Sequence, residues 1–566
     1  MNKFEVARVL DEIAKYAELS EANRFKSLAF EKASRTIAAL DRDPAEMLAS
    51  GELQKTPGIG KTTAAVVEEV LRTGKSRYLE ELRKQYPPGI FELLRVPKLG
   101  LKKVGILHDK LGIGSLDDLE AACKAGRLKT LRGFGEKTEQ SILKGIEYAR
   151  KRETNFLLPV GLEIGEQIRE RLADIDAVEN AEVSGSVRRR LETIRNVNVA
   201  VATRDPKAVT KALANVVANI EILDPNTVKG TARNEVEVYF HLCKPQEFGS
   251  TLLHTTGSQE FVAELLERAG DRQAKTEEEV FERAKAPFVP PERRESADDL
   301  KLKRSRSLVK LEDLRGTFHV HSTFSDGRNT ILEMLTAAHQ RGYEYVGMSD
   351  HSKSAYYAGG LTEEGLRLQQ AEIAKQEREV KPMRVFRGTE ADILGDGGID
   401  YDDATLAAFD FVVASIHSRF GMEKDEMTER ILRALDHPSV TFLGHLTGRK
   451  LLTRPGYTMD FDRVFEKAGQ RGVMIEINGN PNRLDIDWRL VGRALDRGVR
   501  FSIHPDAHSI NEYNALVTGV WVARKAGLSP KEIFNTKSVE EVEEYLSSRA
   551  RASSAPAGSR RPSRKG

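Results

Sequence analysis

The chain has 566 residues, 40% of them hydrophobic, which is enough material for several cores. Its formal net charge is only +2, which excludes binding to nucleic acid through overall charge and leaves that role to local basic patches. No run approaches about eighteen apolar residues and no signal-peptide pattern is present, so we expect a cytoplasmic protein without membrane contact. The two cysteines, Cys123 and Cys243, suit a reducing compartment.

The first 80 residues predict short helices over 3–17, 22–40 and 62–73, where apolar residues recur at helical spacing. Before the third helix stands Lys55-Thr-Pro-Gly-Ile-Gly-Lys61, with a lysine where a Walker-type phosphate loop requires its first glycine. A helix-hairpin-helix fits better, because Gly58 and Gly60 would let backbone N–H groups and a helix N-terminus approach a DNA phosphate.

Related turns recur at residues 97–100 and 131–135, with Gly100, Gly133 and Gly135 in the corresponding positions. One such turn is a weak signal, because glycine turns are common between helices. Three turns at roughly forty-residue spacing predict DNA binding that is independent of base sequence.

Two later segments have the composition of unstructured chain. Residues 273–314 contain Pro287, Pro290 and Pro291 with dense mixed charge, which predicts a partly extended, exposed linker. Residues 546–566 are rich in Ser, Ala, Pro and basic residues, which predicts a disordered basic tail. Non-specific phosphate contacts by this tail are the alternative.

Residues 315–545 alternate short apolar runs with helix-like segments, as in (β/α) units. His319 and His321 stand two residues apart, so both imidazoles leave the same face of an extended chain, and Asp326 follows in the turn. Later apolar runs end on further residues that can bind a metal, namely His351, Glu390, His417, His445, Asp506 and His508. Barrels of such units carry their chemistry at the C-terminal ends of strands.

This clustering predicts a metal site, because isolated core histidines would not recur at one structural position. Histidine and carboxylate ligands suit Zn²⁺ or Mn²⁺ better than Mg²⁺. His339, inside a helical pattern, and His437, before a proline, are interpreted as ordinary residues. The role of His504 stays open.

The ligand pattern resembles that of the PHP (polymerase and histidinol phosphatase) domain. The resemblance implies a distorted seven-stranded barrel with three divalent metals. One metal would be held by His319, His321, Glu390 and Asp506, a second by Glu390, His417 and His445, and a third by Asp326, His351 and His508. The first group would be catalytic through a metal-activated water, without a protein nucleophile.

The order of the segments resembles the bacterial and archaeal family X DNA polymerases that carry a C-terminal PHP domain. That resemblance implies a multidomain α+β fold of helical helix-hairpin-helix domains, a nucleotidyltransferase-type palm and thumb, and a (β/α)7 PHP barrel. The expected boundaries are a lyase-type domain over 1–80, fingers over 81–155, palm over 156–240, thumb over 241–272, linker over 273–314, barrel over 315–545 and tail over 546–566.

Gly185-Ser-Val-Arg-Arg189 matches the family's nucleotide-binding turn, which implies that Gly185, Ser186 and Arg189, with Gly257 and Ser258, contact a deoxynucleoside triphosphate. Asn196, Asn198 and Glu237 stand where the family carries three aspartates. Neutral amides bind Mg²⁺ more weakly than carboxylates do, so Mg²⁺ at the palm is doubtful. A site rebuilt from Glu192, Glu235 and Glu237 is the alternative. Val66 stands where the family's lyase lysine is found, and valine cannot form an imine.

The resemblance implies a monomeric DNA-repair enzyme that acts on gapped, nicked or 3'-ended DNA. Its PHP domain would be a 3'-5' exonuclease or an abasic-site endonuclease, and its polymerase activity would be lost or very weak. An active gap-filling polymerase with a rearranged metal site is one alternative. A non-catalytic protein that binds DNA gaps or ends is another, and a small-substrate phosphomonoesterase is a third.

Overall fold

The computed structural model describes residues 3–19, 24–38, 44–87, 89–97, 99–131, 133–301 and 307–554. The chain divides into two compact units, Met1–Thr154 and Asn155–Gly566, each of which is described by itself. Within the described residues, no helix is both long and apolar enough to span a membrane.

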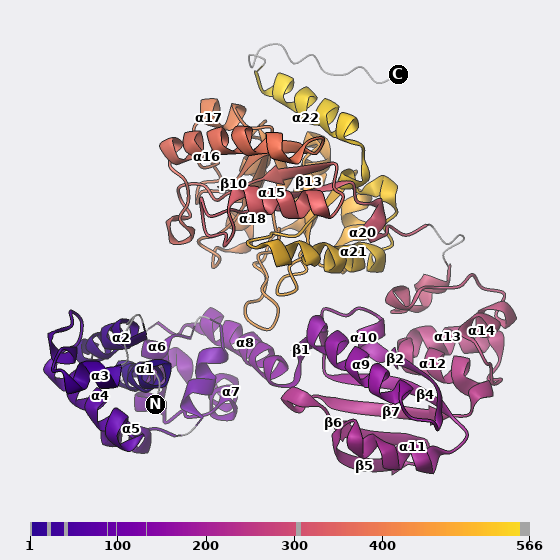
Figure 1. Cartoon of the computed structure of the whole chain (residues 1–566), viewed down its shortest axis with the longest axis horizontal. Helices are drawn as coiled ribbons and strands as arrows, with labels where there is room; N and C mark the ends of the chain where they lie inside the picture. The colour runs from indigo at the N-terminus through magenta and orange to yellow at the C-terminus, as the bar shows by residue number, and fades with distance from the viewer. Residues whose placement is uncertain are drawn as a thin grey trace. The chain divides into compact units, whose positions relative to one another are not determined.

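The first unit is helical, and the three predicted helices are present with shifted ends (Figure 1). Helices α1 and α2 lie side by side, and the buried Tyr16 ring of α1 packs against the partly buried rings of Tyr86 and Phe91. The α-helices are α1 (Lys3–Leu19), α2 (Arg24–Ala38), α3 (Pro44–Ala49), α4 (Lys61–Thr73), α5 (Arg77–Gln85), α6 (Leu101–Leu111), α7 (Leu116–Lys124) and α8 (Glu136–Thr154). Short 3-10 turns η2 (Leu53–Lys55), η3 (Ile90–Arg95) and η4 (Leu128–Thr130) precede α4, α6 and α8.

The three predicted hairpin turns share one design. Ile59, Leu99 and Phe134 are buried at the corresponding positions, while the glycines that follow them are exposed. Gly60 and Gly100 cap α4 and α6 with nearly the same backbone angles, φ −89° and ψ 171° against φ −94° and ψ 169°. The apolar residue therefore anchors each turn in the core, and the helix N-terminus behind it faces solvent.

The second unit begins with a mixed sheet in the order β2-β4-β7-β6-β5, in which only β4 and β7 are parallel. Helix α9 packs across β2 and β4. This sheet lies in the segment for which the sequence predicts a palm. Its elements are β1 (Phe156–Leu157), α9 (Leu158–Ala173), β2 (Val178–Ser184), α10 (Gly185–Arg188), β3 (Thr193–Ile194), β4 (Asn196–Thr203), α11 (Pro206–Ala212), β5 (Ala218–Asp224), β6 (Thr227–Thr231) and β7 (Glu237–Cys243).

The prediction of an extended, exposed linker is wrong for most of residues 274–300. Helix α14 (Glu277–Arg283) packs with α12 (Phe248–Thr256) and α13 (Gln259–Ala269) around a common apolar core. Arg294 is fully buried, and its Nε donates to the Val289 carbonyl while its Nη1 donates to Glu277. The charge-rich composition misled because part of this charge is paired inside the fold.

Seven parallel strands form the predicted barrel, in the order β8 to β14. It is almost closed: the His321 N–H donates to the Ala507 carbonyl at 2.9 Å, and the Ala507 N–H donates to the His319 carbonyl at 3.2 Å. Phe318 lies inside against the Phe411 and Phe442 rings, 5.0 and 5.1 Å away between centroids. The strands are β8 (Gly316–Val320), β9 (Tyr345–Met348), β10 (Arg384–Asp392), β11 (Phe411–Ser415), β12 (Val440–Leu443), β13 (Met474–Asn478) and β14 (Phe501–His504).

Helices surround these strands (Figure 1), so strands such as β8, β11 and β12 are buried at every position and most of their residues are apolar. They are α15 (Ile331–Gln340), α16 (Glu363–Gln376), α17 (Asp403–Ala407), α18 (Lys424–Leu435), α19 (Phe461–Arg471), α20 (Trp488–Leu495), α21 (Ala515–Lys525) and α22 (Val539–Ser554). The predicted tail is wrong at its start, because α22 continues to Ser554 and its Leu546 is buried. Residues 555–566 of that tail lie outside the described residues.

Candidate metal centre

The structure brings the nine predicted ligand side chains together at the C-terminal ends of the barrel strands. Glu390, at the end of β10, lies at their centre and is buried. Its Oε1 is 3.2 Å from His319 Nε2, 3.3 Å from His417 Nε2 and 3.0 Å from His445 Nε2. Its Oε2 is 2.8 Å from His351 Nδ1. With His321 Nε2 at 3.8 Å from Oε2, one carboxylate therefore faces five imidazoles.

The other two carboxylates each join a pair of imidazoles. Asp506 Oδ1 lies 3.5 Å from both His319 Nε2 and His321 Nε2. Asp326 Oδ1 lies 3.5 Å from His351 Nε2 and 3.2 Å from His508 Nε2. Several groups of these residues have ligand atoms close enough for one ion, including one in which His321 joins Asp326, His351 and His508.

Several of these buried polar atoms have no hydrogen-bond partner, although leaving them so costs free energy. They are Nε2 of His319, both ring nitrogens of His321, Nδ1 of His351, Nδ1 of His445 and Oε2 of Glu390. His351 Nδ1 and Glu390 Oε2 approach to 2.8 Å without hydrogen-bond geometry, as two ligands of one ion would. The donor set thus fits divalent cations, with nitrogen and carboxylate ligands suited to Zn²⁺ or Mn²⁺.

A backbone irregularity aims the first pair of histidines. His319 has φ 63°, in the left-handed region, and the register of β8 against β9 shifts between Thr317 and Val320. Phe318 and His319 consequently both face the barrel interior, which a regular strand would forbid. The i, i+2 spacing predicted the shared site but not this distortion.

Two carboxylates orient the imidazoles of candidate ligands by contacting their Nδ1 atoms. The sequence analysis missed both of them. Glu476 on β13 hydrogen-bonds His319 Nδ1, and Asp392 Oδ1 lies 2.7 Å from His417 Nδ1. Such partners fix the ring orientation of a metal-ligating histidine. The signal was a lone acidic residue inside the apolar run Val473-Met-Ile-Glu-Ile477.

His504, left open above, belongs to this supporting layer. Its Nδ1 lies 3.1 Å from Glu476 Oε1, and its Nε2 lies 2.8 Å from Ser502 Oγ. Both ring nitrogens therefore have protein partners.

Burial and the neighbouring charges give the histidines of the centre different pKa values. Burial, followed by the neighbouring His508 and His351, lowers the pKa of His321 to about 3. Burial opposes protonation of His417 and His508 too, but Glu390 next to His417 and Asp326 next to His508 raise each pKa to about 9. Without metal, His321 is therefore neutral at pH 7 while His417 and His508 carry protons.

The side chains at the three palm positions have partners within the sheet. Asn198 Nδ2 donates to Asn196 Oδ1 at 2.8 Å, and His241 Nε2 lies 2.9 Å from Asn198 Oδ1. Glu237 Oε1 forms an ion pair with Lys229 Nζ at 2.8 Å. Among the described residues, no group of candidate metal ligands includes a palm residue.

The alternative palm site is not assembled. The carboxylate of Glu192 accepts a hydrogen bond from Arg489 Nη1 at 2.9 Å and lies 3.6 Å from Arg449 Nη2. Glu235 has φ 58° and is exposed, just before β7. Glu192 is thus bound to barrel residues rather than to Glu237.

The predicted nucleotide-binding residues already have partners within the protein. Arg189 pairs with Glu295 at 3.0 Å and donates to the Thr256 carbonyl at 2.6 Å. Ser258 caps α13 by accepting from the Phe261 N–H. Gly185 has φ 66° and packs against Asn198, where a Cβ would approach Asn198 Nδ2 to 2.8 Å. Gly257 and Ser186, the other two predicted contacts, lie after α12 and within α10.

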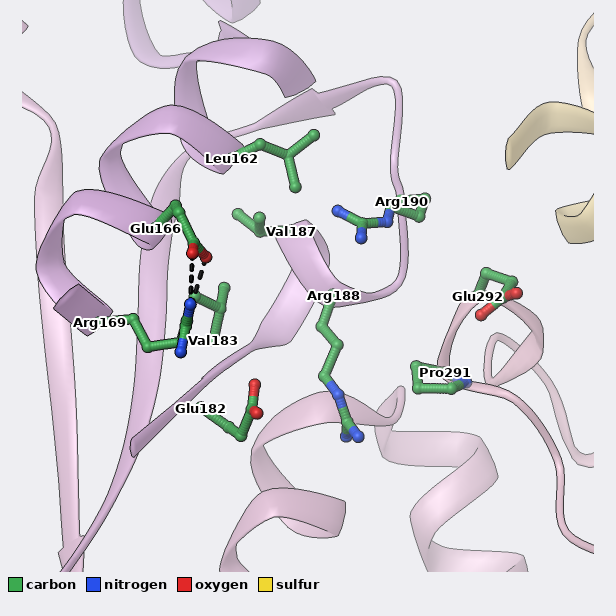
Figure 2. A pocket seen from close by; sticks show the side chains of 10 residues that line it. All are labelled: Leu162, Glu166, Arg169, Glu182, Val183, Val187, Arg188, Arg190, Pro291 and Glu292. Carbon is green, nitrogen blue, oxygen red and sulfur yellow. Dashed lines mark hydrogen bonds and ion pairs between the residues drawn. The ribbon is translucent and has the colours of Figure 1, made fainter. Parts of the chain in front are cut away.

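A cavity of about 290 Å³ lies next to the turn at residues 185–189. It is bordered by α9, β2, α10 and the segment at Pro291 (Figure 2). Arginines and glutamates from these elements line it. Arg169 pairs with Glu166, and Arg188 donates bidentately to Glu277 at 2.8 Å. The charges around the cavity are thus largely neutralised within the protein.

In the first unit, the five predicted DNA-binding glycines occupy the hairpin turns. Gly58 and Gly133 have φ 101° and φ 90°, which a residue with a side chain rarely adopts, whereas Gly60, Gly100 and Gly135 precede helices. Val66 is buried in α4, consistent with a core role. Lys98, in the second turn, lies outside the described residues.

Three segments match known protein families. Residues 1–76 match a helix-hairpin-helix domain, 90–147 a SAM-like helix-hairpin-helix tandem and 317–480 the PHP domain. These matches confirm the hairpins and the barrel expected from the sequence, and they indicate DNA binding and dependence on metal.

Relatives match the whole chain or its barrel part. The DNA polymerase/3'-5' exonuclease PolX of Bacillus subtilis (strain 168) is 34% identical over 96% of this chain and 99% of its own length. A probable phosphatase of Thermoanaerobacter sp. (strain X514) is 25% identical over 41% of this chain and 94% of its own length. A probable phosphatase of Photobacterium profundum is 32% identical over 34% of this chain and 76% of its own length. The chain therefore belongs to the PolX family, the bacterial family X DNA polymerases with helix-hairpin-helix domains and a C-terminal PHP domain.

Proposed function

We propose that this protein is a metal-dependent phosphodiesterase of DNA repair, which removes nucleotides from DNA 3' ends in its barrel. The observation that carries the proposal is the set of buried, unpartnered ligand atoms around Glu390. The B. subtilis relative is named a 3'-5' exonuclease, which supports the same direction of digestion. Abasic-site cleavage is a second reaction within reach of the same centre.

Three divalent ions, Zn²⁺ or Mn²⁺, would be held by the nine side chains. His319, His321, Glu390 and Asp506 form the catalytic group, with His417 and His445 beside Glu390 and with His351 and His508 beside Asp326. Bound ions supply an activated water and neutralise the charge of the phosphoester. Glu476 and Asp392 hold His319 and His417 in the orientation that this requires. No protein nucleophile is needed.

We infer that the palm does not synthesise DNA. Its two asparagines bond one another and its remaining carboxylate is neutralised by Lys229, so Mg²⁺ finds no anionic site there. The partners of this protein are then gapped, nicked or 3'-ended DNA, and a deoxynucleoside triphosphate only as a weak ligand. A monomer suffices, because all of the ligand side chains come from one chain.

The experiment that tests the proposal combines metal analysis with digestion of an end-labelled, 3'-recessed duplex. We expect two or three bound ions per chain and stepwise loss of 3' nucleotides, which a chelator stops. Metal-free protein that still digests the duplex would refute the assignment. Cleavage of small phosphomonoesters without action on DNA would favour the function named for the probable phosphatases.

The hairpins give a first specific prediction about DNA affinity. A Cβ at Gly60 or Gly100 meets no atom within 4 Å, so Gly60→Ala with Gly100→Ala should fold normally. The added methyl groups would hold DNA phosphates away from the helix N-termini. We expect affinity for gapped DNA to fall by about tenfold and its salt dependence to become shallower. Fluorescence anisotropy at several salt concentrations measures both.

The matched control is Gly492→Ala in α20, where a Cβ also meets no atom within 4 Å. This variant should bind DNA as the unmodified protein does. Unchanged affinity in the hairpin double variant would argue against DNA contact at these turns.

A second prediction concerns protons released on metal binding. At pH 7.5 the metal-free centre holds protons on His417 and His508, because the pKa of each is about 9. His319 holds a third proton, because Glu476, Glu390 and Asp506 outweigh its burial and keep its pKa well above the usual value. Metal ligation requires neutral imidazoles, so loading should release about three protons per chain. Calorimetry in buffers of different ionisation enthalpy counts them. The release from His417 and His508 should diminish as the pH rises above about 9, where these two rings lose their protons before metal binds. A release that does not change with pH would contradict the prediction.

A further inference from the structure

Two tyrosines stand exposed on a turn beside the metal centre. Tyr356 and Tyr357 are 85% and 62% exposed, the most exposed aromatic rings among the described residues. They lie in the 3-10 turn η11 (Tyr356–Ala358), with ring centroids 6.0 Å apart and planes at 79°. Neither ring is needed to fill the core, so their removal should leave the fold intact.

The turn that carries them is fixed to ligand residues. The chain leaves the centre at His351, and Leu361 returns to it by donating its N–H to the His351 carbonyl at 2.9 Å. A Cβ on Gly359 would lie 3.5 Å from the carbonyl of Ser325, the neighbour of Asp326. The turn of Tyr356 and Tyr357 is thus held between the chain segments that carry His351 and Asp326.

Cationic side chains lie on two further loops next to the centre. Lys450 and Arg454 pair through their backbones in a tight turn, with the Lys450 N–H 2.8 Å from the Arg454 carbonyl. Leu451 ties that turn to the loop containing Arg483 by donating to the Asn482 carbonyl. Arg483 Nε lies 3.5 Å from Asp506 Oδ2, at the metal centre itself.

The position of Lys450 is electrostatically strained by its cationic neighbours. Partial burial, and then the positive charges of Arg483 and Arg454, lower the pKa of its ammonium group, and the charge of Asp506 offsets this only in part. Arg454 is already engaged, because it donates to the Gly448 carbonyl and stacks on the Phe420 ring at 3.9 Å. A phosphate close to Lys450 and Arg483 would relieve this repulsion.

We propose that these two elements hold the end of the DNA strand: Tyr356 and Tyr357 stack against a nucleobase, and Lys450 binds a neighbouring phosphate. The inference rests on the proposed function and names the residues that recognise its substrate. Aromatic rings stack on any unstacked base and so tolerate every sequence. An ammonium group binds a phosphate as a point charge. Together they would place a phosphodiester bond over Glu390 and Asp506.

The test compares Tyr356→Ala/Tyr357→Ala with Tyr356→Phe/Tyr357→Phe, which keeps both rings. The substrates are a single-stranded oligonucleotide, the same strand ending in a base-free tetrahydrofuran residue, and bis(p-nitrophenyl) phosphate. We expect the alanine variant to raise KM for the normal strand about tenfold. The phenylalanine variant should keep the original KM. Neither variant should change hydrolysis of the small diester. On the base-free strand, the alanine and phenylalanine variants should have the same KM.

Lys450 is tested in the same way, with Lys450→Ala against Lys450→Arg. The alanine variant should raise KM for both strands, since each has phosphates, and arginine should restore most of the affinity. If the unmodified protein leaves DNA and the small diester intact, the proposed function fails, and this inference with it. If it cleaves both and the alanine variants match it on DNA, this inference alone is overturned. Equal losses on DNA and on the small diester would also overturn it, because they would indicate general damage.

Discussion

Replacing Glu390 by glutamine is expected to lower phosphodiester hydrolysis by at least about a thousandfold. Among the described residues, Glu390 is the one carboxylate within 3.3 Å of three imidazole Nε2 atoms, from His319, His417 and His445. An amide of the same shape keeps the volume but removes the charge on which the metal group depends. Loss of bound-metal chemistry costs several kcal/mol of transition-state stabilisation, and each 1.4 kcal/mol is about tenfold in rate. Steady-state rates on DNA and on a small diester measure the loss.

The control separates lost chemistry from lost structure. Asp462 is 45% exposed and pairs with surface arginines such as Arg493, so Asp462→Asn should keep both rate and metal content. Elemental analysis of Glu390→Gln should show fewer ions per chain, while its circular dichroism spectrum stays native. A Glu390→Gln protein that hydrolyses within tenfold of the original rate would contradict the central role of this carboxylate.

The second large effect is expected at the palm: the unmodified protein should extend a primer across a one-nucleotide gap at least about a thousandfold more slowly than a variant that restores three aspartates and removes Lys229. Synthesis requires carboxylates that hold Mg²⁺ against the triphosphate and the primer 3'-hydroxyl. The triple variant Asn196→Asp/Asn198→Asp/Glu237→Asp restores the three aspartates. The charge at the site would rise from about −1 to about −3.

The structure shows why this triple variant alone should recover little activity. Lys229 Nζ, 2.8 Å from Glu237, would neutralise part of the restored charge, so Lys229→Met should be added. We expect primer extension to increase from the triple to the quadruple variant. Gel-resolved extension with Mg²⁺ measures the series, and a catalytically inert barrel, Glu390→Gln, prevents removal of the product. Robust extension by the otherwise unmodified palm would refute the inference.

The barrel and the grouping of its candidate ligands were predictable because two kinds of signal coincided there. Apolar runs revealed the strands, and each run ended on a chemically distinctive residue, so that His351, His417 and His445 could be assigned before any contact was known. The hairpins were predictable for a similar reason, since Gly58 and Gly133 need positive φ.

The remainder depends on tertiary contacts that sequence periodicity does not encode. Glu476 lies within a buried strand and looks like an interruption until its contact with His319 is seen. Arg294 belongs to a charge-rich segment whose burial follows from a pairing with Glu277, seventeen positions away in the chain. The pairing of Lys229 with Glu237 joins two strands whose register had to be known first.

Closure of the barrel between β8 and β14 has a consequence for biosynthesis. The seam joins His319 and His321, from the first strand, to Ala507, and Asp506 and His508 flank that residue. A ribosome has therefore translated nearly the whole barrel before the last ligands exist. A growing chain that already carries the hairpins cannot yet assemble the candidate metal centre. The order of the segments thus places assembly of this centre after synthesis of the helix-hairpin-helix domains and of nearly all of the barrel.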